Sequence, residues 1–534
     1  MTREERVAGC FDYRGKLLSV MPLGNGHINN TYLVVTDTNK YVLQQINTKV
    51  FPNVEQLISN MLEVTRHIAK KHFTCTLVKV RNGKYYVECE DGCYRMYDLV
   101  DGVCIENAVS PREMYLTGLG FGLFQQEMAD FEGTIHEVIP DFHNTVKRYE
   151  NFERAVRDNP AGRREECETE IRRLRAYKRY ASIIVDKLSE GVLPVRVTHN
   201  DTKINNLILD EKKNRALSVI DLDTVMEGSL LYDFGDAVRS GCNSAAEDEE
   251  DARSVYCKLD YFRALCRGFF RHTKDMLTEE EKKLLALSGI ILTYECALRF
   301  LTDHLNGDVY FKVSKPDHNL IRCRTQLALM KDMIKNLSSL ESIVEQELKG
   351  QSLTVRKIAN YLNLFDSTSG EIKDDTCFAC KHTEDKIHFY FKCERMWKNS
   401  MYTEFNAPLY HGDIVELMIT LGDTNRYLEV EVNENNAQYC VLITNADGKG
   451  DISIDYLPET VIESNVKMLD DNWAMYEIIM EKETLKQLGM TEEVKFNAHR
   501  QIFDNDGNLY LRSLNPTYGL TFHDAEAFID VKFD

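Results

Sequence analysis

The sequence contains neither an apolar leader nor an apolar run long enough to span a membrane. Its first residues, MTREERVAGCFDYRGK, are charged where a signal peptide would be hydrophobic. The 15 cysteines follow no regular spacing, a pattern typical of free thiols in a reducing compartment rather than of a disulfide framework. We therefore expect a cytoplasmic protein that does not associate with membranes.

Positive charge is also scarce. The 65 Lys and Arg residues are outnumbered by 85 Asp and Glu residues, which gives a net charge of -20. Because nucleic-acid binding depends on positive surface, this balance argues against a nucleic-acid partner. It does not exclude a small anionic ligand, since a few local cations can reverse the field inside one cleft.

With 534 residues the chain is longer than one hydrophobic core usually supports, so we expect three domains. Residues 1–100 alternate β-prone runs with turns around one amphipathic helix. Residues 101–350 are mainly helical, with a long charged helical stretch at 163–191. Residues 351–534 carry strands at regular spacing, one of them at 466–480, which predicts an all-β sandwich.

The segment THNDTKINNLILDEKKNRALSVIDLDT contains the most specific pattern in the chain. Two β-prone runs, 207–209 and 216–220, flank a charged turn and predict an antiparallel hairpin. In that hairpin Asn206 enters the first strand opposite Asp221, which leaves the second, and Asp201 lies just upstream.

An amide oxygen and a carboxylate that meet at a strand end form a hard oxygen site suited to Mg²⁺. A further carboxylate nearby can accept a proton from an incoming hydroxyl, and phosphoryl transfer needs this combination. The alternative is that Asp and Asn here merely favour a turn. The complete string, H-x-D-x-x-x-x-N followed by a hairpin and I-D-x-D, is far more specific than a turn.

This string resembles the aminoglycoside phosphotransferase superfamily, whose members share the protein-kinase-like fold. The resemblance implies an α+β chain, with a bilobal kinase-like part made of an antiparallel-sheet N-lobe and a helical C-lobe, followed by the β-sandwich. It makes Asp201 the catalytic residue and Asn206 and Asp221 the Mg²⁺ ligands. It also makes His199 a residue that shapes the loop, and Asp233 a structural Asp.

Further motifs narrow the resemblance to the N-acetylhexosamine 1-kinases. They are PLGNGHINNTYLV, YVLQQIN, RMYDLVDG, FHNT, VIDLDTVMEGSLLYDFGDAVR and RFLTDHLNGDVYFKV. The family implies ATP-dependent phosphorylation of the anomeric C1 hydroxyl of N-acetylglucosamine or N-acetylgalactosamine, with Mg²⁺. The alternatives are a related kinase of choline, homoserine or an aminoglycoside, and a sugar-binding protein without turnover.

The nucleotide site follows from the same resemblance. Gly24 and Gly26 occupy the loop that covers the ATP phosphates, although a two-glycine turn alone reads as an ordinary β-turn. Tyr97 and Leu99 occupy the hinge that binds adenine, where the plain alternative is a strand leading into a loop. Gln44 stands where a kinase N-lobe normally carries Lys, a departure that the N-acetylhexosamine kinases share.

For the sugar, the resemblance points to His27, Arg299 and Tyr310 together with Asp201. A planar Arg donor and an aromatic Tyr suit sugar hydroxyls and an acetamido group. The plain alternative for Arg299 is a surface pair with Asp303, one helical turn away.

Three other patterns have ordinary explanations. The segment Asp141–Thr145 either closes the sugar site or begins a helix. The acidic run 247–251 is expected to fill the first turn of a helix, where carboxylates favour the positive end of the dipole. Cys377 and Cys380 have no second pair at zinc-ligand spacing, so we expect buried thiols.

The C-terminal domain resembles the family 9 carbohydrate-binding module, in NAPLYHGDIVELMITLGDTNRYLEVEVNENN and NPTYGLTFHDAEAFIDVKF. Leu514 stands where that family often carries a Trp, and the chain has only Trp397 and Trp473. We expect the domain either to bind sugar or to act as a scaffold, for instance in a homodimer.

Overall fold

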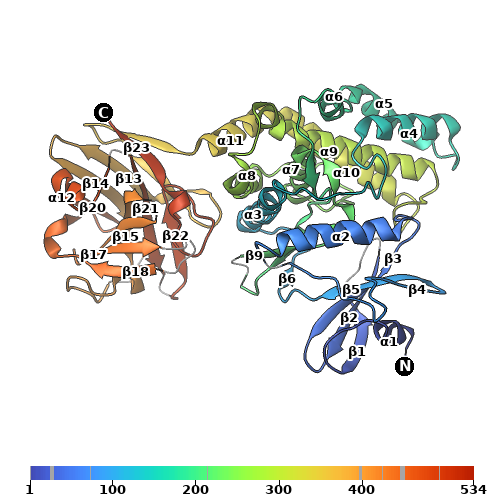
Figure 1. Ribbon diagram of the computed structural model, residues 1–534. Helices are drawn as coiled ribbons and strands as arrows, with labels where there is room; N and C mark the ends of the chain where they lie inside the picture. The colour runs from blue at the N-terminus through green and yellow to red at the C-terminus, as the bar shows by residue number, and fades with distance from the viewer. Residues whose placement is uncertain are drawn as a thin grey trace. The chain divides into compact units, whose positions relative to one another are not determined.

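The computed structural model describes residues 2–23, 29–72, 74–212, 215–395, 400–423, 425–445, 452–491, 493–504 and 506–534. Its contacts divide the chain into two compact units (Figure 1). The first comprises Met1–Val109 and Glu113–Glu345, and the second Ser110–Arg112 and Gln346–Asp534.

The first unit opens with an antiparallel five-stranded sheet in the order β1-β2-β3-β5-β4. Its core combines residues of β2, β3 and β5 with the short helix that precedes the sheet. Helix α2 is amphipathic and buries its apolar face, because its apolar residues recur at helical spacing. The elements are α1 (Arg3–Ala8), β1 (Leu17–Pro22), β2 (Asn30–Thr36), β3 (Lys40–Ile46), α2 (Val54–Ile68), β4 (Val87–Cys89) and β5 (Gly92–Asp98).

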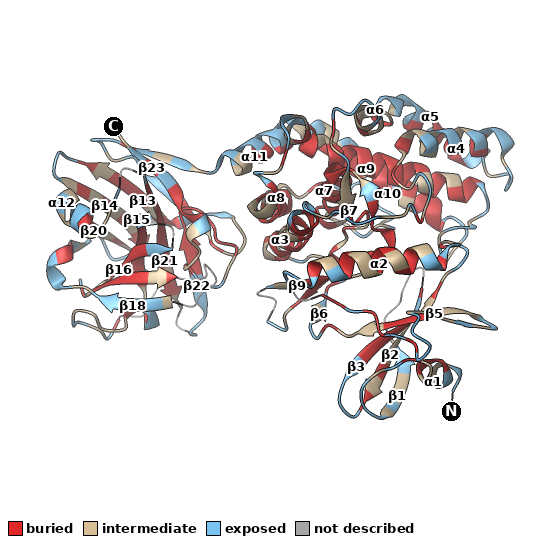
Figure 2. Ribbon diagram, in the orientation of Figure 1, coloured by how far each residue is buried: buried red, intermediate tan, exposed pale blue. Residues whose placement is uncertain are grey.

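Helices make up most of the rest of this unit, and Figure 2 shows buried residues concentrated on α7, α9 and α10. The helices are α3 (Pro111–Met128), α4 (Thr145–Asp158), α5 (Glu168–Ala176), α6 (Ile183–Ser189), α7 (Leu230–Gly241), α8 (Leu259–Thr273), α9 (Glu279–Leu305), α10 (His318–Lys335) and α11 (Leu337–Lys349). By length and composition α9 could cross a membrane, but 89% of its most apolar window is buried, as in the core helix of a globular protein.

Two small sheets lie among these helices. One pairs β7 (Arg196–Thr198) with β10 (Met226–Gly228), and the other has the order β6-β8-β9, from β6 (Val103–Cys104), β8 (Leu207–Leu209) and β9 (Ala216–Val219). Together they carry the loop with the H-x-D-x-x-x-x-N string.

Where the structure describes it, the second unit consists of strands joined by loops and 3-10 turns, with one short α-helix, α12 (Lys482–Gln487). Phe378 and Phe389 of one layer meet Phe496 of the other at ring distances of 5.7 Å, so two layers enclose the main core. The strands are β11 (Ser352–Val355), β12 (Leu362–Asp366), β13 (Ile372–His382), β14 (Lys386–Glu394), β15 (Ile414–Asp423), β16 (Arg426–Asn433), β17 (Gln438–Asn445), β18 (Ile452–Tyr456), β19 (Glu463–Met468), β20 (Trp473–Glu481), β21 (Val494–Phe503), β22 (Leu509–Ser513) and β23 (Ile529–Phe533).

The predicted fold class is confirmed: an antiparallel sheet and a mainly helical region precede a β-sandwich. Two element predictions were wrong. The helical stretch at 163–191 is not one helix, because a 3-10 turn at Lys178–Tyr180 separates α5 from α6. The strand at 466–480 is the hairpin of β19 and β20, which turns at Leu469–Asn472.

The acidic run 247–251 is not helical either. Glu247 pairs with Arg239 of α7 at 3.0 Å, and Asp248 pairs with His318 of α10 at 3.1 Å. Side-chain partners on two other helices therefore determine the path of this segment. In β13, Cys377 and Cys380 are an odd number of residues apart, so their side chains leave opposite faces of the strand.

Candidate active site

The predicted hairpin forms. Leu207 of β8 pairs with Val219 of β9, and the N–H of Ile220 donates to the carbonyl of Asn206 at 2.9 Å. Asn206 therefore lies opposite Ile220, one residue before the predicted partner Asp221, and the two predicted residues are still close together at one end of the hairpin.

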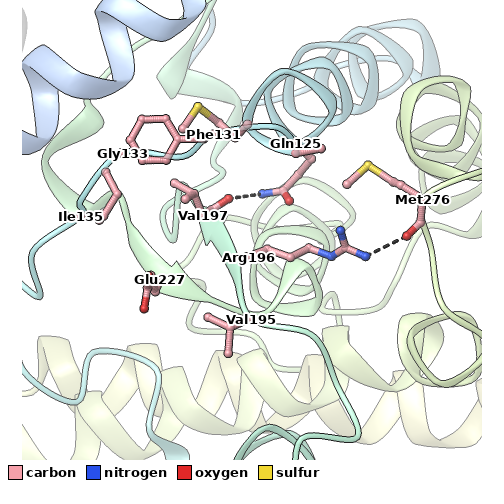
Figure 3. A pocket seen from close by; sticks show the side chains of 11 residues that line it. Gln125, Phe131, Gly133, Ile135, Val195, Arg196, Val197, Glu227 and Met276 are labelled. Atoms are coloured by element: carbon pink, nitrogen blue, oxygen red, sulfur yellow. Dashed lines mark hydrogen bonds between the residues drawn. The ribbon is translucent and has the colours of Figure 1, made fainter.

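Asp233, in the first turn of α7, fixes the loop between β7 and the hairpin. Its buried carboxylate accepts hydrogen bonds from the backbone N–H of His199 at 2.9 Å and of Asn200 at 2.7 Å. Gln125 donates to the same carboxylate at 2.7 Å and also reaches the carbonyl of Val197 (Figure 3). Asn200 has φ 66°, a left-handed conformation that Asn tolerates better than most residues. Asp233 thereby stabilises a strained turn immediately before Asp201.

His199 is completely buried between Phe121 and Phe124, at ring distances of 5.4 and 5.8 Å. Its Nε2 lies 2.9 Å from the carbonyl oxygen of Ile220, so that nitrogen carries the proton. Its Nδ1 then accepts the backbone N–H of Asp201 at 3.3 Å. One imidazole therefore joins the hairpin end to the backbone of Asp201.

The Asp201 carboxylate has two side-chain partners. The ammonium of Lys203 lies 2.9 Å from Oδ1, and the amide of Asn206 donates to Oδ2 at 2.9 Å. Burial raises the pKa of Asp201, but the charge and hydrogen bond of Lys203 outweigh it and lower that pKa to about 2. Asp201 is therefore an anion at every physiological pH.

Asp221 stands at the turn after β9, with φ 59°. It remains accessible to solvent at the site. The surrounding protein removes much of its hydration, and with the negative charges of Asp223 and Asp201 this raises the Asp221 pKa to about 7. Excess negative charge of this kind favours a divalent cation. Because the amide nitrogen of Asn206 binds Asp201, its oxygen is the atom left for such a cation, and these residues fit Mg²⁺.

Gln44 lies on β3 directly opposite Arg95 of β5. Its amide oxygen accepts from Nε of Arg95 at 3.0 Å and from Nη2 at 2.6 Å, and its nitrogen donates to Thr31 at 3.2 Å. The Arg95 guanidinium also forms an ion pair with Asp223. The polar atoms of Gln44 are thus engaged inside the sheet.

The hinge residues lie beside an apolar cluster. Cys75, Val100 and Ile208 form a buried cluster, and Tyr97 packs against it, as do Leu217 and Ile220 from the hairpin. The N–H of Leu99 donates to the carbonyl of Lys40 at 3.2 Å. This cluster joins the sheet to the hairpin and offers an apolar surface for a flat ring. The other predicted nucleotide and sugar residues of the N-lobe, Gly24, Gly26 and His27, lie outside the described residues.

Arg299 of α9 is surrounded by aromatic rings. Its guanidinium carbon lies 5.3 Å from the ring centre of Phe142, 5.5 Å from that of Phe311 and 5.8 Å from that of Tyr310. These distances are those of cation–π contacts. The structure therefore brings Arg299 and Tyr310 together, and Tyr310 keeps 48% of its surface exposed.

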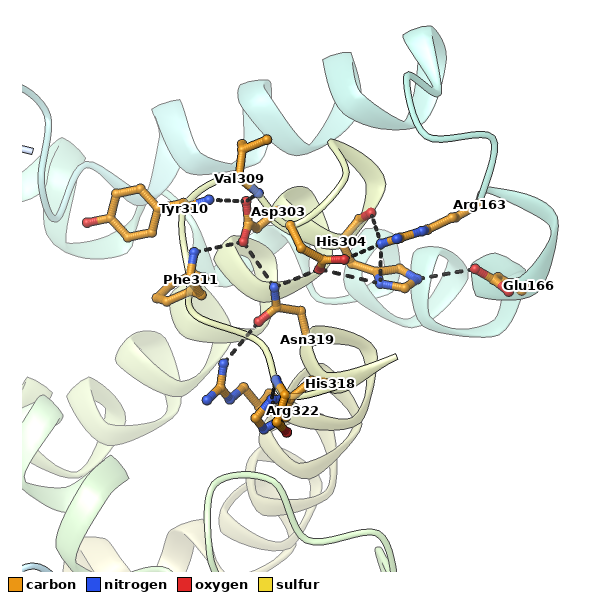
Figure 4. A network of polar contacts seen from close by, with 12 residues as sticks. Arg163, Glu166, Asp303, His304, Val309, Tyr310, Phe311, His318, Asn319 and Arg322 are labelled. Atoms are coloured by element: carbon orange, nitrogen blue, oxygen red, sulfur yellow. Dashed lines mark hydrogen bonds and ion pairs between the residues drawn. The ribbon is translucent and has the colours of Figure 1, made fainter. Parts of the chain in front are cut away.

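Asp303 holds the loop that carries Tyr310 (Figure 4). Its carboxylate accepts the backbone N–H groups of Val309, Tyr310 and Phe311 at 2.8–2.9 Å, and the amide of Asn319 at 3.0 Å. Asp303 therefore acts on the loop backbone rather than as a surface partner of Arg299.

His143 connects this aromatic group to the loop before Asp201. Its Nε2 lies 3.0 Å from the carbonyl of Asn200, and its Nδ1 lies 2.8 Å from the carboxylate of Glu295. Glu295 is one turn before Arg299 on α9. The neighbouring Asn144 caps α4, so the segment Asp141–Thr145 begins a helix, and its Phe142 also contacts Arg299.

Sequence reasoning missed Lys203, Arg95, Asp223 and the pair of His143 and Glu295. Lys203 had a signal, since it is two residues after Asp201 in the quoted string. Arg95 had one too, as a single charge in the β-prone run CYRMY. The His143 and Glu295 pair had none, because 152 residues separate its members.

Residues 19–262 match the model of the phosphotransferase enzyme family, APH. The first unit therefore carries an APH phosphotransferase domain. An aminoglycoside phosphotransferase from Alicyclobacillus acidocaldarius is similar in structure, with 14% identity over 64% of this chain and 96% of that chain and a TM-score of 0.44. A microcompartment-associated aminopropanol kinase shares 16% identity over 63% and 98%, with a TM-score of 0.40. The C-terminal part resembles a family 9 carbohydrate-binding module from Caldicellulosiruptor kristjanssonii, with 12% identity over 34% and 96% and a TM-score of 0.26.

Proposed function

We propose that this protein is a cytosolic, ATP- and Mg²⁺-dependent kinase that phosphorylates the anomeric C1 hydroxyl of an N-acetylhexosamine. The observation that carries the proposal is the position of Arg299 and Tyr310. The two side chains are in contact within a group of aromatic rings. The buried pair of His143 and Glu295 connects this group to the backbone just before Asp201. An uncharged, hydroxyl-rich acceptor with an acetamido group suits a site made of these aromatic rings and the Arg299 donor.

In the proposed reaction, Asp201 orients the acceptor hydroxyl and takes its proton. Because the Asp201 pKa is about 2, the carboxylate is a weak base in the ground state. It accepts the proton as the new phosphorus–oxygen bond forms and the hydroxyl becomes more acidic. Lys203, 2.9 Å from Asp201, holds this carboxylate in place and adds positive charge beside the transferred phosphoryl group.

Asn206 and Asp221 would hold the Mg²⁺, whose role when bound is to neutralise charge on the β- and γ-phosphates. Asp201 and Asn206 share a hydrogen bond, so the hydroxyl-orienting residue and the proposed metal ligand keep a fixed spacing. The apolar cluster around Tyr97 would receive the adenine ring.

A panel of acceptors tests the proposal. ATP consumption is measured with N-acetylglucosamine, N-acetylgalactosamine, choline and kanamycin, for the wild type and for Asp201→Ala. We expect turnover on at least one hexosamine and its loss in the variant. No turnover on either hexosamine would refute the substrate, and turnover that survives Asp201→Ala would refute the mechanism.

The second candidate is a small-molecule kinase with a cationic acceptor, and the APH match itself supports it. The aminoglycoside and aminopropanol phosphorylated by the similar structures are amines. The charge of Arg299 at the acceptor side disfavours such substrates, so we rank this candidate second. Turnover of choline or kanamycin in the same panel would reverse that order.

A further inference from the structure

The third strand of the N-terminal sheet carries a neutral residue at the position where a kinase normally has Lys. The buried side chain of Arg95 lies directly opposite that position on the neighbouring strand. Gln44 occupies the lysine position of β3, and the β3–β5 register places Arg95 across from it. A Lys at position 44 would project from the same part of the sheet. The positive charge is therefore displaced by one strand.

Arg95 is only 1% exposed and its guanidinium is held on several sides. Two of its nitrogens donate to the Gln44 amide oxygen, another contacts the sulfur of Met61 on α2 at 2.9 Å, and the group forms an ion pair with Asp223. An unpaired buried charge is very costly, so Arg95 and Asp223 must stay together in the folded protein.

Asp223 belongs to the turn that begins with Asp221, and other N-terminal residues reach the same turn. Asn29, which follows the 24–28 segment, donates to Asp223 at 2.8 Å. Asn60 of α2 donates to the carbonyl of Val225 at 3.1 Å. The sheet (through Arg95), Asn29 and α2 (through Asn60) are thus all bound to one turn, and of these three contributors Arg95 alone brings a charge.

We propose that Arg95 is a positioning residue that replaces the missing β3 lysine in function, by holding Asp223 so that the turn presents Asp221 to the metal–nucleotide complex. In a conventional kinase the lysine joins the sheet to a glutamate on the helix that packs against it. Here the sheet is joined to the metal-binding turn itself. This inference rests on the proposed nucleotide and metal site, and it is independent of which acceptor is phosphorylated.

Mg²⁺-dependent binding of ADP to the full chain, without acceptor, gives the direct test. We expect Arg95→Met to weaken Mg·ADP binding by about 10- to 100-fold, as is usual for partners that orient metal ligands. Binding of N-acetylglucosamine alone should stay within about twofold, because Arg299 and Tyr310 are untouched. Arg95→Lys keeps the charge but loses the planar guanidinium, so its Mg·ADP affinity should lie between those of the wild type and Arg95→Met. It replaces Arg95→Met in the test if Arg95→Met does not fold.

The relocation variant gives the sharper result. In Gln44→Lys/Arg95→Met the cation returns to β3, and we expect Mg·ADP binding to recover at least tenfold over Arg95→Met alone. Arg512→Met is the matched control, since Arg512 is also a buried Arg, paired with Asp375 at 2.8 Å in the second unit. It should lower stability and leave Mg·ADP binding unchanged.

Wild-type affinity in Arg95→Met, or no recovery in the relocation variant, would overturn the inference. An equal loss of binding in Arg512→Met would do the same, because it would show a general effect of removing a buried charge. If the wild type binds Mg·ADP but phosphorylates neither hexosamine, the substrate proposal fails and the Arg95 result still stands.

Discussion

Glu295 and His143 form a buried pair, 2.8 Å apart, that joins the central helix α9 to the loop before Asp201. Thr145 also donates to Glu295, at 2.6 Å. The carboxylate thus supports both the imidazole behind Asn200 and the start of α4. Replacing this carboxylate by a neutral amide should therefore lower the stability of the first unit.

In Glu295→Gln the hydrogen bonds to a charged acceptor are weakened, and we expect the free energy of unfolding to fall by about 2 kcal/mol. Urea denaturation followed by far-ultraviolet circular dichroism measures this change, because the helical first unit gives most of that signal. Glu279→Gln is the control on the same helix. Glu279 is 80% exposed, so its pair with Lys282 should contribute little to stability. Equal effects of the two changes would contradict the role given to Glu295.

Lys203→Met should move the pH dependence of catalysis. The Lys203 ammonium holds the Asp201 pKa near 2, so its removal raises that pKa and protonates Asp201 at a higher pH. Since Asp201 must be ionised to orient the hydroxyl, the acid limb of kcat/KM should shift to higher pH. The measurement is a pH–rate profile of wild type and variant. A lower but unshifted profile would show that Lys203 acts on the phosphates alone.

Arg299→Lys should impair the acceptor site selectively. Lysine keeps the charge but loses the planar group that lies among Phe142, Tyr310 and Phe311. Loss of one hydrogen bond from this planar donor to the sugar, about 1.4 kcal/mol, corresponds to a tenfold rise in the KM of the sugar. The KM of ATP should not change. Steady-state kinetics, with the sugar and ATP varied in turn, measures the two KM values separately. A parallel rise in the KM of the sugar and the KM of ATP would place Arg299 outside the acceptor site.

The second unit should lose stability as pH rises. Glu416, Glu429 and Glu431 lie together on β15 and β16, and burial followed by mutual repulsion raises the pKa of Glu416 and Glu431. Burial raises the pKa of Glu429 to about 7. The folded state then binds more protons than the unfolded state above about pH 4.5, so this contribution is present at low pH and is lost toward and above pH 7.

Glu431→Gln removes one of these ionisations. We expect it to raise the melting temperature at pH 8 and to leave that temperature nearly unchanged at pH 5. Differential scanning calorimetry at the two values tests this, with Glu459→Gln, on the turn after β18, as a control. Destabilisation by Glu431→Gln at pH 8 would mean that the three carboxylates are ionised and compensated.

The sequence predicted those parts of the site whose members are close in the chain. Asp201, Asn206 and Asp221 span one loop and one hairpin, and local strand and turn preferences suffice to place them. Arg95 and Asp223, or His143 and Glu295, meet only through tertiary packing, so no local pattern identifies the pairs. The same reason explains the acidic run 247–251, whose partners on α7 and α10 override its helical preference.

Helix α9 is one continuous stretch of 27 residues and makes polar contacts with three other parts of the first unit. Glu281 near its start pairs with Arg196 of β7, Glu295 supports His143, and Asp303 near its end holds the Tyr310 loop. One inserted residue would turn everything beyond it by about 100° and advance it by about 1.5 Å. Related chains should therefore keep the length of α9 between Glu281 and Asp303.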